Sequence, residues 1–132
     1  MAGTAAALIL IVEDNEKSRK LVRDVLRFTG YETAETETAE HGIRLAQELH
    51  PALILMDIQL PGIDGITAVG RLRADPTTAG IPVIAVTASA MMHDRQRIAD
   101  AGFDGYQAKP IRVKELLEMV RQTLERRHAA GA

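Results

Sequence analysis

The feature that most constrains the fold is a short apolar run, Leu-Ile-Leu-Met at residues 53–56, which ends abruptly in Asp57. A continuous apolar run of this length is typical of a strand covered on both faces, as in a parallel sheet. Ligands of open α/β sheets bind at the carboxyl ends of the strands, where Asp57 would lie. Taken alone, an acid in this place is more often a helix cap or a turn residue. The functional interpretation therefore depends on the neighbouring strands.

Three further runs end in polar residues of different chemistry. They are Leu8–Val12 before Glu13 and Asp14, residues 82–86 before Thr87, and residues 103–108 before Lys109. Residues 31–37 alternate in polarity and are acidic, which is typical of an edge strand that tolerates solvent. The chain thus carries five strand candidates, and four of them end in acids, a hydroxyl or an amine.

Apolar residues at helical spacing predict a helix in each intervening segment. The first helix has Asn15 as its cap and ends at Gly30, and the second runs from Ala39 to Leu49 before Pro51. The third runs from its cap, Asp64, to Asp75, and the fourth covers residues 91–101. The fifth carries an apolar stripe from Val113 to Leu124 and is expected to fray from Arg126. Strand and helix alternate five times. This order predicts a doubly wound α/β fold, in which helices cover both faces of a five-stranded parallel sheet.

Composition narrows the class of protein. A chain of 132 residues makes one domain, which we place at residues 8–125 between tails at 1–7 and 126–132. The absence of cysteine excludes disulfides and thiolate metal sites. Two Phe, two Tyr, no Trp and a net charge of -2 argue against a nucleic-acid surface. No signal peptide and no apolar run of roughly 20 residues is present, so we expect a cytoplasmic protein without membrane contact. The ragged ends favour a complete small protein.

The polar strand ends form a coherent chemical set, because the carboxyl ends of parallel strands share one edge of the sheet. Three carboxylates there, Glu13, Asp14 and Asp57, would repel one another and invite a hard cation such as Mg²⁺. Lys109 adds a positive charge and Thr87 a hydroxyl. Such a site suits the transfer of a phosphoryl group to a carboxylate, with Asp57 of the middle strand as the nucleophile.

Four motifs in order complete the pattern. They are Val12-Glu13-Asp14-Asn15, Met56-Asp57-Ile58-Gln59-Leu60-Pro61-Gly62-Ile63-Asp64-Gly65, Val86-Thr87-Ala88 and Lys109-Pro110. With these motifs at the proper spacing, the chain resembles the receiver domain of two-component response regulators from about Leu8 to Leu124. The resemblance implies a flavodoxin-like fold with strand order 2-1-3-4-5.

The resemblance also implies roles for the acids. Asp57 would accept phosphate from a histidine kinase or a histidine phosphotransfer protein. Asp14, Asp57 and the backbone carbonyl of Gln59 would ligate Mg²⁺. Glu13 stands where many relatives have Asp, and it would act mostly through water. Gln59 and Ser89 would flank the attacking water and tune dephosphorylation.

The remaining implied roles concern the response to phosphate. Lys109 would bind one phosphate oxygen, Thr87 would bond another, and Tyr106 matches the aromatic switch position. The Lys109-Pro110 bond is expected to be cis. Phosphorylation would change the surface over residues 91–121, and a downstream protein partner would bind there. The chain itself would be a monomer or a weak dimer. The chain is similar to stand-alone regulators of chemotaxis and of bacterial cell division and polarity, and nearer the latter.

Other interpretations stay open at this point. Asp14 could cap the first helix, Thr87 could be an ordinary strand-end hydroxyl, Lys109 a solvated lysine, and Tyr106 fixed core filling. The whole protein could be a phosphate sink or a binding module without phosphorylation. An aspartyl-phosphate phosphatase of the haloacid-dehalogenase type would need a doubled Asp motif and a cap domain. A flavodoxin-like cofactor carrier would need a phosphate loop, where this chain has acids.

Overall fold

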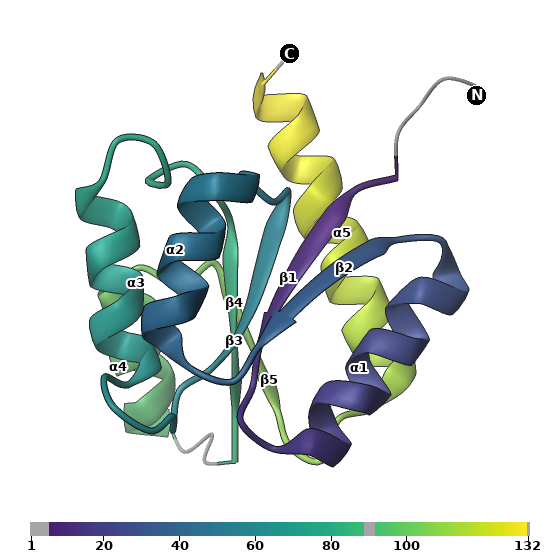
Figure 1. Cartoon of the computed structure of the whole chain (residues 1–132), viewed down its shortest axis with the longest axis horizontal. Coiled ribbons are helices and arrows are strands. Elements are labelled where there is room, and N and C mark those ends of the chain that lie inside the picture. The colour runs from purple at the N-terminus through teal and green to yellow at the C-terminus, as the bar shows by residue number, and fades with distance from the viewer. Residues whose placement is uncertain (1–5, 89–91, 132) are drawn as a thin grey trace.

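The computed structural model describes residues 6–88 and 92–131 and contains a parallel sheet of five strands in the order β2-β1-β3-β4-β5 (Figure 1). The strands are β1 (Leu8–Val12), β2 (Glu32–Thr36), β3 (Leu53–Asp57), β4 (Val83–Thr87) and β5 (Gly105–Ala108). The helices are α1 (Glu16–Thr29), α2 (Ala39–Leu49), α3 (Gly65–Ala74), α4 (Met92–Ala101) and α5 (Val113–Gly131). The predicted fold class and strand order are confirmed.

Helices cover both faces of the sheet. Figure 1 shows α2, α3 and α4 on one face and α1 and α5 on the other. Alternate residues of each central strand enter two separate cores: in β3, Ile54 packs on the side of α2, α3 and α4, and Leu55 packs on the side of α1 and α5. Every residue of β3 and β4 is buried. Burial on both faces explains why these strands are continuously apolar rather than alternating.

Side-chain caps define where the helices begin. The side chain of Asn15 accepts a hydrogen bond from the Ser18 N–H at the start of α1, and Asp64 does the same for Thr67 at the start of α3. At the other end of α1, Gly30 is left-handed with φ 108°, as the sequence predicted. His50 ends α2 with φ 47° in the same conformation, although the sequence pointed only to Pro51.

Helix α5 is longer than the sequence predicts. The apolar stripe predicts fraying from Arg126, which is wrong, because the helix continues to Gly131. No proline or glycine interrupts the chain between Leu124 and Gly131, and arginine and alanine are strong helix formers, so propensity extends the helix past its apolar stripe. Within the described residues, no helix combines the length and the apolarity that a bilayer crossing requires.

Candidate functional site

The carboxyl edge of the sheet brings the predicted polar residues together. In the parallel register, Val12 lies beside Met56 and Asp57 beside Val86. Thr87 lies beside Ala108, the residue before Lys109. Each strand therefore stops at the same level, and the acids that follow β1, the acid that ends β3 and the lysine after β5 converge.

Three carboxylates form the centre of this edge. One oxygen from each of Glu13, Asp14 and Asp57 lies within 4.8 Å of the others. Glu13 and Asp57 are buried, with 4% and 5% of their surface exposed, whereas Asp14 is exposed. Two buried acids beside one solvent-facing acid make a cluster that is open on one side. Oxygen donors this close together fit a hard divalent cation such as Mg²⁺, which retains several waters.

Lys109 partly balances the charge of the cluster. Its Nζ lies 2.8 Å from Glu13 Oε1 and 3.0 Å from Asp57 Oδ2. Burial disfavours the charged amine, but the hydrogen bonds to Glu13 and Asp57 outweigh this effect and raise the pKa of Lys109 above its ordinary value. The Lys109 N–H also donates to the Thr87 carbonyl at 2.8 Å, which ties the end of β5 to β4. The alternative of a solvated lysine is therefore wrong.

The two buried acids are held differently. Asp57 Oδ1 accepts a hydrogen bond from the Gln59 N–H at 3.2 Å, while its Oδ2 faces Lys109. Glu13 Oε2 accepts from the Asn15 N–H at 3.1 Å. Burial raises the pKa of Glu13 above its ordinary value, although Lys109 and the Asn15 N–H favour the ionised form. Asp14 does not cap α1, because Asn15 does, so the cap interpretation of Asp14 is also wrong.

The loop after β3 depends on Gly65, the last residue of the second motif, whose role no pattern in the sequence indicates. The Gly65 N–H donates to the Ile58 carbonyl at 2.8 Å, so α3 begins directly against the end of β3. A Cβ at Gly65 would lie 2.6 Å from the Asp57 carbonyl oxygen and 2.9 Å from Ile58 Cα. Glycine is required here by close approach of two backbone segments, which no local pattern reveals.

The remaining predicted residues lie around the cluster. Thr87 is buried at the end of β4, and Gln59 is exposed in the loop after Asp57. Tyr106 is half-buried in β5, and the Arg95 guanidinium of α4 lies 5.3 Å from the centre of its ring. The predicted cis Lys109-Pro110 bond is confirmed. Ser89, with its predicted tuning role, and Met91, at the edge of the predicted partner surface, lie outside the described residues.

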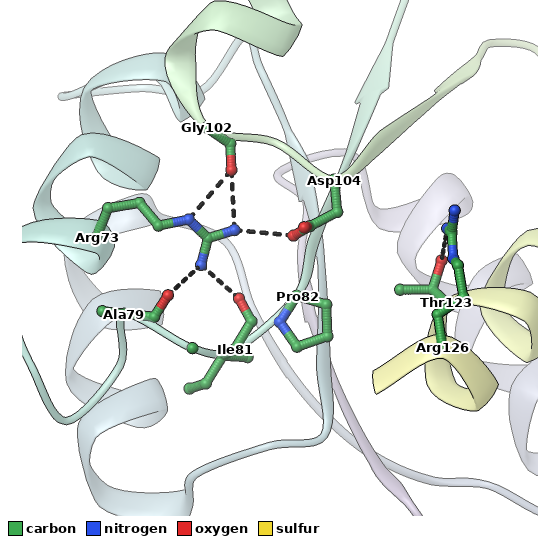
Figure 2. Close-up of a pocket in the computed structure, with 9 residues that line it drawn as sticks. Arg73, Ala79, Ile81, Pro82, Gly102, Asp104, Thr123 and Arg126 are labelled. Atoms are coloured by element: carbon green, nitrogen blue, oxygen red, sulfur yellow. Dashed lines mark hydrogen bonds and ion pairs between the residues drawn. The ribbon is translucent and has the colours of Figure 1, made fainter. Parts of the chain in front are cut away.

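A hollow of about 550 Å³ lies near the amino ends of β4 and β5 (Figure 2). None of the three acids of the cluster is among the residues that line it. On one side of it, Arg73 donates hydrogen bonds to the carbonyls of Ala79, Ile81 and Gly102 and to the Asp104 carboxylate. Every guanidinium nitrogen of Arg73 is thus engaged within the protein. These five hydrogen bonds of Arg73, called the Arg73 clasp below, leave its guanidinium no donor for a ligand. We therefore interpret the Arg73 clasp as a structural feature rather than as a binding site.

Comparison with known proteins agrees with the geometry. Residues 9–121 match the family described as the response regulator receiver domain. The polar-differentiation response regulator DivK of Brucella ovis is 46% identical over 116 residues, which are 88% of this chain and 94% of that protein. DivK of Brucella anthropi is 45% identical over the same length and coverage.

Solved structures share the whole architecture. A putative response regulator from Chloroflexus aurantiacus has a TM-score of 0.87 and 31% identity, with 91% of this chain and 98% of that chain covered. The receiver domain of the sensor histidine kinase PA1611 from Pseudomonas aeruginosa has a TM-score of 0.85 and 33% identity, with 92% and 99% covered. That domain was solved with a magnesium ion coordinated in its active site cleft.

Proposed function

Because the chain belongs to the response regulator receiver domain family, we propose that Asp57 is its phosphoacceptor in a two-component or phosphorelay system. The observation that carries this proposal is the position of Asp57, buried at the end of the middle strand, between Lys109 Nζ and the other two acids. A buried carboxylate with an amine at 3.0 Å and a cation site beside it is equipped as a nucleophile toward phosphorus.

The transfer is a displacement at phosphorus. An oxygen of Asp57 forms a bond to the phosphoryl group of a phosphohistidine, the P–N bond breaks, and its electron pair stays on the imidazole nitrogen. Mg²⁺ held by Asp14, Asp57 and the Gln59 carbonyl would neutralise charge on the phosphoryl oxygens. Lys109 already contacts Asp57 and would bind a phosphoryl oxygen as charge moves there. The chain catalyses its own phosphorylation, and we propose no other enzymatic activity.

The phosphorylated state would be read at the surface. Thr87 and Lys109 would bond the new phosphoryl oxygens, and Tyr106, which packs beneath Arg95, would follow Thr87 inward. We propose that this movement changes the surface of α4, β5 and α5, and that a downstream protein binds there. The partner would be a protein rather than a nucleic acid, and the chain would bind it as a monomer or a weak dimer. Gln59 and Ser89 would set the rate of dephosphorylation. By their names, the DivK relatives act in polar differentiation, and we propose a cytoplasmic role of that kind.

Intact mass after incubation with acetyl phosphate tests the proposal. We expect the parent to gain one phosphoryl group only when Mg²⁺ is present, and Asp57→Asn to gain none while remaining folded. A parent that gains no phosphate under any condition would contradict the proposal and indicate a constitutive binding module. Phosphorylation without any change in partner binding would instead indicate a phosphate sink.

Asp14→Ala separates metal binding from folding. Asp14 is exposed, so its removal leaves the core intact, but it takes away the solvent-facing ligand of the cluster. We expect Mg²⁺ affinity to fall by at least about tenfold, measured by NMR titration, with an unchanged melting temperature in the absence of Mg²⁺. Parent-like Mg²⁺ binding in this variant would show that the ion is held elsewhere.

A further inference from the structure

A cleft of about 630 Å³ opens beside the acid cluster, between the loop after β3 and helix α4. Its polar lining consists of Asp14, Gln59, Asp64 and Arg97, and its apolar lining of Ile58, Leu60, Pro61 and Ile66. Because Asp14 belongs to both the cluster and the cleft, the cleft adjoins the proposed phosphoacceptor site.

Arg97 is the one basic side chain among the described residues that line this cleft. It lies on α4 and is exposed, and its guanidinium forms no hydrogen bond or ion pair with the described part of the chain. No hydrogen bond or ion pair joins it to Asp64, whose Oδ1 caps α3, among the described residues. Within the part of the chain that the structure describes, Arg97 is therefore a cation on the cleft wall that no intramolecular contact uses.

The charge of the site makes this cation significant. A phosphodonor is an anion, and the cleft beside the acid cluster carries the carboxylates of Asp14 and Asp64. Mg²⁺ would offset the charge of Asp14 and Asp57, and Lys109 is paired with Glu13 and Asp57 inside the site, so neither provides a positive charge on the outer wall of the cleft. A positive charge on the cleft wall raises the local concentration of anions and orients them toward the reacting atom.

We propose that Arg97 recruits and orients a small anionic phosphodonor of the acyl phosphate class, which a cleft of about 630 Å³ with one basic side chain on its wall can admit. This inference rests on the proposed function. In the reaction, an Asp57 oxygen bonds to phosphorus, the P–O bond of the acyl phosphate breaks, and the electron pair leaves with the carboxylate product. Arg97 is a specificity residue in this step, since it contacts the donor and not the Asp57 carboxylate.

The test compares Arg97→Ala, Arg97→Lys and the control Arg44→Ala, which removes an equal charge from an exposed position of α2. Rates of phosphorylation by acetyl phosphate are measured at saturating Mg²⁺ over a range of donor concentrations. We expect Arg97→Ala to lower the second-order rate constant about three- to tenfold, and the loss to shrink at high salt. Arg97→Lys should recover most of the rate, and Arg44→Ala should match the parent.

A binding measurement supplies a readout that does not depend on turnover. NMR titration with acetylphosphonate, a donor analogue that cannot transfer its phosphorus, should show weaker binding to Arg97→Ala than to the parent. Equal rates and equal binding for the two proteins would overturn the inference, and so would an equal loss in Arg44→Ala. A loss confined to transfer from a phosphohistidine protein would also overturn it, because Arg97 would then serve a protein donor.

The failure of this inference is distinguishable from failure of the proposed function. If the parent gains phosphate at Asp57 and Arg97→Ala gains it equally fast, only the role of Arg97 is wrong. If neither the parent nor Asp57→Asn gains phosphate, the phosphoacceptor proposal itself is wrong.

Discussion

At the scale of single residues, the site is defined by the different surroundings of three acids. Asp14 faces solvent, while Glu13 and Asp57 are buried and share the amine of Lys109. Two buried carboxylates and one amine leave an excess of negative charge in a poorly solvated place. Such an arrangement is unfavourable for folding and favourable for binding a cation, so we expect that removing one of the buried charges stabilises the fold and weakens metal binding.

Glu13→Gln tests whether the buried charge of Glu13 lowers the free energy of unfolding and supports Mg²⁺ binding. Because burial raises the pKa of Glu13, the folded state holds the proton more tightly than the unfolded state does. The ionisation penalty is therefore absent below the ordinary pKa of 4.5 and complete above the raised pKa. We expect Glu13→Gln, without Mg²⁺, to have a higher free energy of unfolding than the parent at pH 7, and an equal one near pH 4.

Urea unfolding without Mg²⁺ at the two pH values measures both quantities, and a Mg²⁺ titration should show weaker binding by the same variant. Lower stability of Glu13→Gln at pH 7 would show that its ion pair with Lys109 outweighs the cost of burial. The substitution keeps the shape of the side chain, so packing is matched between the two proteins.

At the scale of elements, the start of α3 positions the proposed nucleophile, Asp57. The first helical residue, Gly65, touches the backbone of Asp57 and Ile58 so closely that no Cβ fits. The helix thereby fixes the direction in which β3 ends. Asp64 supports this geometry by capping the helix through the Thr67 N–H at 2.8 Å.

Gly65→Ala should therefore damage the site and the fold together. We expect a loss of about 1 to 3 kcal/mol in the free energy of unfolding, because the methyl group forces two backbone segments apart. Gly70→Ala, in the same helix with nothing within 4 Å of its added Cβ, is the control and should stabilise by about 0.5 to 1 kcal/mol. Chemical denaturation measures both, and equal effects of the two variants would refute the close-contact explanation.

At the scale of the whole molecule, the two edges of the sheet have separate tasks. The carboxyl edge carries the acid cluster, and near the amino ends of β4 and β5 Arg73 clasps the segments that join α3 to β4 and α4 to β5 (Figure 2). The Asp104 carboxylate also accepts from the Val83 N–H at 2.8 Å, so the clasp holds the first residue of β4. Stability at one edge and chemistry at the other can therefore be altered separately.

Arg73→Lys should lower stability without slowing phosphorylation. Lysine cannot reproduce the planar set of donors, so most of the five hydrogen bonds are lost, and we expect a cost of about 2 to 4 kcal/mol. Arg71→Lys, at an exposed position of the same helix, is the matched control. Thermal unfolding and the acetyl phosphate rate check the two halves of the prediction. A slower rate at a temperature where Arg73→Lys is folded would show that the two edges are coupled.

The sequence by itself determined the elements, their order and the composition of the site. Continuous apolar runs such as the one before Asp57 predicted buried parallel strands, and parallel strands place their carboxyl ends at one edge. The caps Asn15 and Asp64 are local, since each bonds a residue only three positions away, so they were also predictable. The long end of α5 was missed because propensity, rather than an apolar stripe, extends it.

Only the tertiary structure decided which groups touch. Four features depend on segments that lie far apart in the chain. They are the ion pairs of Lys109 with Glu13 and Asp57, the close contact that excludes a Cβ at Gly65, the hydrogen bonds of Arg73, and the position of Arg97 on the cleft. The pattern of apolar and polar residues in one segment indicates which of its side chains face the core and which face solvent. It does not indicate distances between segments, which depend on how the helices and the sheet pack. For that reason the residues that make up the site could be predicted from the chain, whereas their burial, their pKa shifts and the open side of the cluster could not.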